Sequence, residues 1–147
     1  MTEFDIQKCL FDKFLELNDY SNIEFLKKDE DGNYINVNIP NIPFSAPADK
    51  TWFELYIKSN TPYPVAVLDG SQDRITGVFY IDIITPIDVG EDEAETKYRW
   101  ICRLFNNNKY INDVVINSCC LSTKGNELDH YRLQVAIEWE ADIDKEM

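Results

Sequence analysis

The feature that most constrains the fold is one long alternating stretch, Arg74 to Thr85, with the sequence RITGVFYIDIIT. A period of two with β-branched and aromatic residues is typical of a half-buried β-strand. One face carries the apolar side chains and a glycine in phase with them: Ile75, Gly77, Phe79, Ile81 and Ile83. The other face carries Arg74, Thr76, Tyr80 and Asp82. We expect a central strand, with Asp82 paired to a base on a neighbouring strand, such as Arg74 or Lys58.

Similar patterns predict the other main elements. Alternation indicates strands at 51–58, 111–122 and 130–141, of which the last is the most regular. Apolar residues at helical spacing predict helices over 2–17 and 91–105. One helix precedes the strands and one interrupts them. This order predicts an α+β fold: a single domain with a mostly antiparallel or mixed β-sheet and two main helices packed on one face.

Residues 18–50 are the least regular part of the chain. A short strand is expected at 23–26, followed by a charged turn at 27–33 with Gly32 at its tip. A proline-rich, extended connector comes next. We therefore expect one domain over residues 1–147, with 18–50 as an irregular insertion and extended connector.

Both helices carry signals at their ends. Thr2 caps the first helix, with Asp5 three positions later in a capping-box arrangement. The second helix begins with acidic residues, where the helix dipole favours negative charge. Its main apolar stripe consists of Ala94, Tyr98, Ile101, Cys102 and Phe105. Trp100 and Leu104 lie beside this stripe, and they either widen the buried face or belong to a subunit contact.

The charge of the chain limits its partners. The net charge is −13, from 27 acidic and 14 basic residues. A protein that binds the phosphate backbone needs a basic face, and an anionic membrane surface also attracts basic proteins. We therefore expect no specific DNA binding and no membrane. An acidic surface can keep a protein soluble, let DNA pass without sticking, or mimic DNA.

Targeting signals and cysteines point to a cytosolic protein. The N-terminus has no basic region followed by an apolar run, and no apolar run reaches the roughly 18 residues that span a bilayer. The four cysteines, Cys9, Cys102, Cys119 and Cys120, include no CxxC pair. With a single histidine, a zinc site is not expected, and the thiols are expected to be reduced.

Signatures of catalysis are absent from the sequence. It contains no GxSxG, P-loop, GxGxxG or HExxH motif. His130 lies in phase with the polar side of its strand, where a solvated histidine is expected. A Cys–His pair of Cys119 or Cys120 with His130 across a hairpin is the one enzymatic hypothesis. We assign no catalytic, cofactor-binding or metal-binding residue and expect no enzyme.

Several of these segments together resemble phage tail terminator, or tail completion, proteins of the lambda type. The central part of the likeness runs from Arg74 through Gly77–Ile83 to Pro86 and Gly90, and continues into the following helix. The last alternating strand, 131–139, fits the family pattern. So does the strand that begins at Trp52, with Phe44 and Pro47 before it. The resemblance covers about residues 44–141, and the 18–43 segment and the strong acidity depart from the pattern.

This resemblance implies a structural role in the virion. Such proteins form a ring, usually a hexamer, on the tail tube, where the ring ends tube polymerisation and joins the tail to the head–neck connector. The implied partners are further copies of this chain, the tail tube protein and the connector protein. DNA would pass through without specific binding, and the protein would be assembled in the host cytoplasm and reside in the virion tail or neck.

Candidate residues for these contacts follow from exposure and charge. Rings are built from contacts between different faces of one subunit, and spare aromatic side chains suit such contacts. The candidates for the subunit interface are Trp52, Tyr56, Tyr80, Trp100 and Leu104. The candidates for an acidic bore that repels DNA are Asp88, Glu91, Asp92, Glu93 and Glu95. Two alternatives stay open: an acidic DNA mimic or inhibitor of a host enzyme, and the small Cys/His enzyme.

Overall fold

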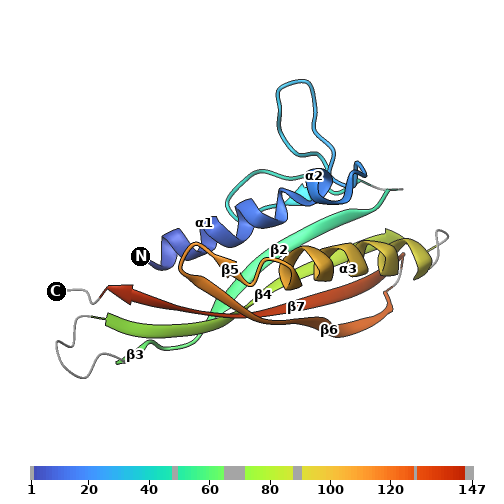
Figure 1. Ribbon diagram of the computed structural model, residues 1–147. Coiled ribbons are helices and arrows are strands. Elements are labelled where there is room, and N and C mark those ends of the chain that lie inside the picture. Colours follow the sequence, from blue (N-terminus) through green and yellow to red (C-terminus); the bar gives the residue numbers. More distant parts are fainter. Residues whose placement is uncertain (1, 48–49, 65–71, 88–90, 128, 145–147) are drawn as a thin grey trace.

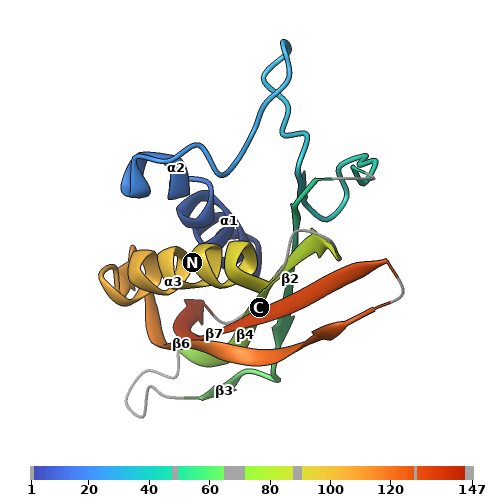
Figure 2. The same ribbon diagram turned by 90° about the vertical axis from the view of Figure 1, so that its right-hand side faces the viewer.

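The computed structural model describes residues 2–47, 50–64, 72–87, 91–127 and 129–144. Its elements are α1 (Glu3–Phe14), α2 (Leu17–Ser21), β1 (Val37–Asn38), β2 (Trp52–Ser59), β3 (Tyr63–Pro64), β4 (Gln72–Pro86), α3 (Glu91–Asn106), β5 (Tyr110–Ile111), β6 (Val114–Asn126) and β7 (His130–Asp144). A curved sheet carries α1 and α3 on one face (Figure 1), and Figure 2 shows both helices on that side. The predicted α+β fold is confirmed.

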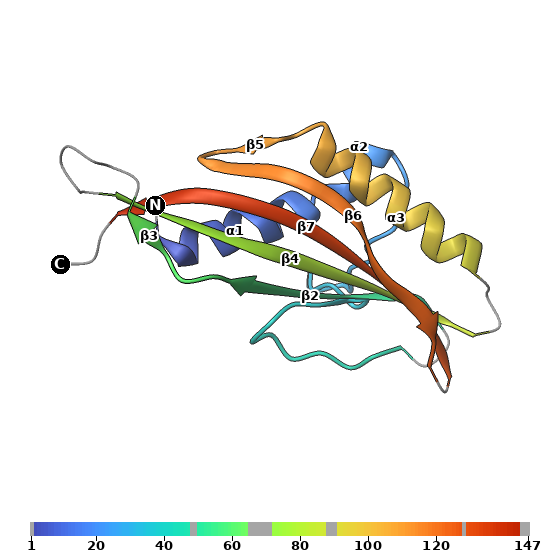
Figure 3. The same ribbon diagram turned by 90° about the horizontal axis from the view of Figure 1, so that it is seen from below.

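The sheet is built around β4, as the alternation predicts. The strand order is β1-β2-β4-β7-β6-β5, and β3 pairs with the start of β4. Among the strand pairs of the described residues, β1–β2 is parallel and the others are antiparallel. Strand β4 pairs with β2 on one side and with β7 along its whole length on the other. Figure 3, seen from below, shows these long strands on the side away from the helices.

The inner face of β4 forms the centre of the core. Its predicted apolar residues are fully buried, and Gly77 lies directly opposite Trp139 of β7. A Cβ atom at position 77 would lie 2.5 Å from Cζ2 of Trp139 and still closer to the carbonyl oxygen of Lys58. Because Gly77 has no side chain, the ring of Trp139, the largest fully buried side chain, fits beside the backbone of β4.

The first helix confirms one prediction and corrects another. The backbone N–H of Asp5 donates to Oγ1 of Thr2 at 3.2 Å, and the N–H of Thr2 donates to Oδ2 of Asp5 at 2.9 Å, which completes the capping box. The helix ends at Phe14, however, and not at residue 17. Leu17, fully buried, begins the separate short helix α2.

Helix α3 packs on the sheet with a face rotated slightly from the predicted stripe. Tyr98 and Cys102 are half-exposed, whereas Lys97 and Leu104 are buried. Only 2% of Leu104 is exposed, so its side chain belongs to the hydrophobic core of the chain. The predicted stripe counted apolar residues alone and so left out Lys97. Its aliphatic stem is buried against apolar surface, while its ammonium group bonds to a carboxylate.

The strand predicted at 23–26 does not form. Phe25 and Leu26 are buried, but they have no partner strand among the described residues: the N–H of Phe25 donates to the carbonyl oxygen of Ile23, and side-chain amides bond to their other backbone groups. Asn18 donates from Nδ2 to the carbonyl oxygen of Leu26 and accepts from its N–H, at 2.7 and 2.8 Å, and Asn36 donates to the carbonyl of Phe25. Such side-chain bonds compete with strand pairing.

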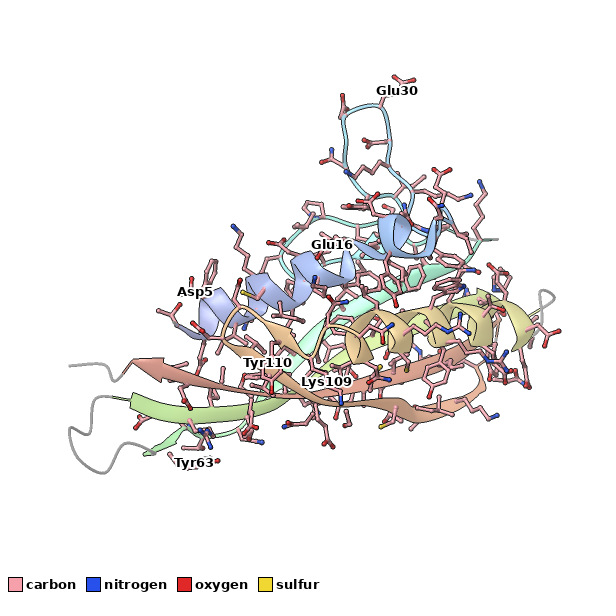
Figure 4. The ribbon with its side chains drawn as sticks, in the orientation of Figure 1. Asp5, Glu16, Glu30, Tyr63, Lys109 and Tyr110 are labelled. Carbon is pink, nitrogen blue, oxygen red and sulfur yellow. The ribbon has the colours of Figure 1, made fainter. Side chains whose placement is uncertain are left out.

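The charged turn at 27–33 is present as predicted. A single bridge joins Lys28 and Tyr34, and Gly32 has a φ of 83°. The turn stands away from the sheet and helices, with Glu30 at its tip (Figure 4). Among the described residues, the helices are too short or too polar to cross a bilayer.

Candidate subunit interface

The sheet face opposite the helices carries two of the predicted interface residues side by side. Tyr56 of β2 is directly paired with Tyr80 of β4, and their rings stack with centroids 4.9 Å apart. Nε2 of Gln134 donates to the hydroxyl of Tyr56, and the Lys58 ammonium lies 6.0 Å from the centre of the Tyr80 ring. Burial, and then the nearby charge of Asp82, raise the pKa of Tyr56. The two tyrosines form a half-exposed aromatic pair contributed by neighbouring strands.

Asp82 lies on the same face, but its partner differs from both predicted bases. It is 4% exposed, and Nη1 of Arg132 donates to its Oδ2 at 2.6 Å. Arg132 also contacts Glu54 at 3.3 Å and Glu127 at 2.9 Å. Burial disfavours the guanidinium charge, yet the bonds to Asp82 and Glu54 outweigh it and raise the pKa of Arg132. The prediction of Arg74 or Lys58 was wrong, because the β4–β7 register places Arg132 beside Asp82.

The far end of this face is covered by the chain itself. The Phe44 ring, from the connector between β1 and β2, packs on Trp52 with centroids 5.2 Å apart. Ile84 points to the same side of the sheet and is only 1% exposed. The indole nitrogen of Trp52 is buried and has no hydrogen-bond partner in the part of the chain that the structure describes. Trp52 therefore packs against the chain's own connector.

Trp100 lies on α3 and is half-buried. Its ring meets the Tyr20 ring edge-on at 6.2 Å, and the Arg103 guanidinium lies 4.9 Å from its centre. Of the five predicted interface residues, four are half-buried: Trp52, Tyr56, Tyr80 and Trp100. Leu104 is in the core, which corrects its assignment as a surface contact.

The predicted acidic residues at the start of α3 fall into two groups. Glu91 and Asp92 are exposed, and Glu95 is half-buried. Glu93 instead accepts hydrogen bonds from Thr51 and, at 2.8 Å, from Nζ of Lys97. Burial acts to raise the pKa of Glu93, but these bonds outweigh it and lower the pKa. Asp88 lies outside the described residues.

Two partly open sheet edges are features that sequence reasoning missed. In the part of the chain that the structure describes, β1 pairs with Phe53 and Glu54 of β2, and β5 pairs with Val114 and Val115 of β6. Within the described ranges, the rest of β2 and β6 has a neighbouring strand on one side only. The outer half of β6 is exposed and carries Leu121, 38% exposed. Edge position depends on strand order, which alternation does not reveal.

The proposed Cys–His pair is not assembled. His130 lies at the start of β7, whereas Cys120 is paired with Ala136, six residues further along that strand. At about 3.3 Å per residue, the two side chains are roughly 20 Å apart. The predicted pairing of Cys119 or Cys120 with His130 was therefore wrong. No group of three metal-binding side chains occurs among the residues described.

Comparison with known proteins assigns the family. The model of a family described as phage tail terminator protein matches residues 23–139, including the 23–43 segment that departed from the pattern quoted above. Five chains of solved structures match this chain. One of them aligns with a TM-score of 0.59 at 18% sequence identity, and the alignment covers 95% of this chain and 98% of the matched chain. At this low identity, the similarity supports the fold alone. No curated protein matches. The chain therefore belongs to the phage tail terminator protein family, a family of structural proteins of the phage tail.

Proposed function

We propose that this protein caps the phage tail tube as a ring of identical subunits, ending tube polymerisation and joining the tail to the head–neck connector. A hexamer is the favoured ring, assembled in the host cytoplasm. The observation that carries the proposal is the family match over residues 23–139, which spans every element from β1 to most of β7.

The two open sheet edges support a ring. An unpaired strand edge presents free N–H and C=O groups that a strand of another chain can pair with. The free parts of β2 and β6 lie at opposite sides of the sheet, because the order runs from β1-β2 to β6-β5. Contact between two different edges is heterologous, and repeated heterologous contacts close into a ring when the rotation allows it.

The aromatic residues give such an interface candidate anchors. Tyrosine and tryptophan are enriched at protein interfaces because they combine a large apolar area with a polar group. Tyr56 and Tyr80 are half-exposed on the open sheet face, and Trp100 is half-exposed on α3. We propose that these three side chains contact neighbouring subunits, the tube or the connector.

The acidic charge supports a passage for DNA. A negative surface repels the phosphate backbone and keeps passing DNA from adhering. The net charge is −13, and Glu91, Asp92 and Glu95 gather at the start of α3. We propose that this end of α3 faces the bore. The DNA-mimic alternative is less favoured, because Glu54, Asp82 and Glu127 surround Arg132 instead of forming an unpaired acidic row.

Electron microscopy of the purified protein, alone and with cognate tail tubes, tests this function. We expect rings of one size, and rings at one end of tubes whose growth has stopped. Light scattering of the same samples gives the subunit number. A protein that stays monomeric at every concentration and leaves tubes uncapped would contradict the proposal.

A matched pair of variants tests the role of the β6 edge. Leu121→Lys places a charge on the open edge, whereas Phe4→Lys places the same charge at a 78% exposed apolar position on α1. We expect Leu121→Lys to reduce ring formation while the melting temperature stays unchanged. Equal assembly of the two variants would remove β6 from the interface.

A further inference from the structure

Two thiols that lie 17 residues apart in the sequence meet between α3 and β6. The Sγ atoms of Cys102 and Cys119 are 2.9 Å apart, and Sγ of Cys102 also lies 3.6 Å from the carbonyl oxygen of Cys119. A disulfide bond is about 2.05 Å long, so the two sulfurs need to approach by less than about 1 Å. Both residues are half-exposed, which leaves the pair accessible to small molecules.

We propose that Cys102 and Cys119 are a redox-active pair that forms a reversible intramolecular disulfide when the protein meets an oxidising low-molecular-weight disulfide. The cytosol keeps such thiols reduced, and the medium outside the cell does not. The disulfide would then join α3 to β6 in particles that have left the host cell.

The two cysteines have different roles in this reaction. The hydrogen bond from Cys119, aided by one from Tyr98, lowers the pKa of Cys102 despite its partial burial. The same thiol–thiol contact, together with burial, raises the pKa of Cys119. Because the thiolate is the attacking species, Cys102 is the nucleophile and Cys119 the resolving thiol.

The atoms and electrons balance with one molecule of oxidant. The Cys102 thiolate attacks one sulfur of the oxidant, breaks its S–S bond and releases one small thiolate, leaving a mixed disulfide on Cys102. That thiolate takes up the proton of Cys119. The Cys119 thiolate then attacks Sγ of Cys102 and releases the second small thiolate, which takes up from the solvent the proton that Cys102 lost on forming its thiolate. Two protein thiols are oxidised and one external disulfide is reduced to two thiols.

The other two cysteines serve as controls. Cys120 follows Cys119 on β6 and is exposed, and successive side chains on a strand point to opposite faces. Cys9 lies on α1, where its sulfur accepts a hydrogen bond from Asn112 at 3.1 Å. Changing Cys9 and Cys120 to serine gives a background in which Cys102 and Cys119 are the remaining thiols.

The test is oxidation of this double variant and of the unmodified protein with oxidised glutathione. Intact-mass measurement of the double variant should show the loss of two hydrogen atoms without a glutathione adduct, and no free thiol after denaturation. Peptide mapping of the unmodified protein should find Cys102 joined to Cys119. The cross-link should raise the melting temperature by roughly 10 °C, as expected for a closed loop of this length, and dithiothreitol should reverse the rise.

Single variants separate this bond from unrelated oxidation. In the same background, Cys102→Ser and Cys119→Ser should show no rise in melting temperature, and Cys119→Ser should retain glutathione on Cys102. Two free thiols after oxidation of the double variant would overturn the proposal. So would mapping of the unmodified protein that finds only bonds through Cys9 or Cys120.

Discussion

Gly77→Ala tests how the centre of the sheet is packed. The added methyl group would lie 2.5 Å from Cζ2 and 2.8 Å from Cε2 of Trp139, and would also press on the carbonyl oxygen of Lys58. The Trp139 ring is fully buried, and the carbonyl belongs to the backbone of β2. Neither can move without disturbing its neighbours, so we expect a substantial loss of stability.

The size of the effect follows from two opposing contributions. Adding a methylene-sized group to a well-packed core costs about 1–3 kcal/mol, and this site lies at the upper end because one of the close contacts is backbone. Alanine restricts the unfolded chain and returns about 0.4–1 kcal/mol. The net loss is therefore about 2 kcal/mol, which lowers the melting temperature of a chain of this size by roughly 4–8 °C.

Thermal and urea unfolding, followed by circular dichroism, measure this loss. Gly125→Ala is the matched control, because Gly125 lies on β6 and a Cβ there meets nothing within 4 Å. We expect the control to be as stable as the parent protein, or slightly more stable. Equal stability of the Gly77→Ala and Gly125→Ala proteins would refute the packing argument.

A double-mutant cycle identifies Trp139 as the source of strain. Trp139→Leu destabilises the protein on its own, but it removes the indole atoms that oppose a Cβ at position 77. Gly77→Ala should therefore cost at least about 0.5 kcal/mol less in that background than alone. A cycle that shows strict additivity would place all of the strain at the Lys58 carbonyl.

Three further predictions concern polar contacts. Arg132→Ala leaves the buried Asp82 carboxylate without this partner and should lower the free energy of unfolding, measured in urea, by about 3 kcal/mol. Arg74→Ala removes a half-exposed ion pair and should lower it by less than about 1 kcal/mol. Equal losses in the two variants would contradict this prediction. The pKa of Glu93 is lowered in the folded state, so its stabilising contribution is present above pH 4.5 and is lost as the pH falls below that value. The difference in melting temperature between the parent protein and Glu93→Gln should therefore shrink below pH 4.5. A constant difference from pH 3 to 7 would refute this prediction. Burial and the neighbouring thiols raise the pKa of Tyr98 to about 12, so ultraviolet titration should show a late tyrosine ionisation that Tyr98→Phe removes.

Local patterns in the sequence determined the main elements. The period of two in 74–85 and 130–141 fixed which side chains of β4 and β7 enter the core, because burial of one sheet face requires alternation. Thr2 and Asp5 fixed the start of α1, since a capping box needs only residues three positions apart. Family motifs over these segments likewise indicated the phage tail terminator family.

Contacts between distant residues were decided by the tertiary structure. The side-chain amides of Asn18 and Asn36 bond to backbone groups of residues 25–26, and these groups are then not available for strand pairing. Arg132 reaches Asp82 because of one register among several that alternation permits. In each case the deciding partner lies far away in sequence, where spacing carries no information.

The candidate interface shows the same division. Alternation placed Tyr56 and Tyr80 on the polar side of their strands, and the structure adds that the strands are neighbours and that the rings stack. Leu104 was assigned to a subunit contact but is buried, because the rotation of α3 about its axis is set by packing against the sheet. The sequence by itself determined which residues alternate and where helices begin. Strand order and helix rotation, which set the open edges and bring Cys102 to Cys119, arise only when the elements pack together.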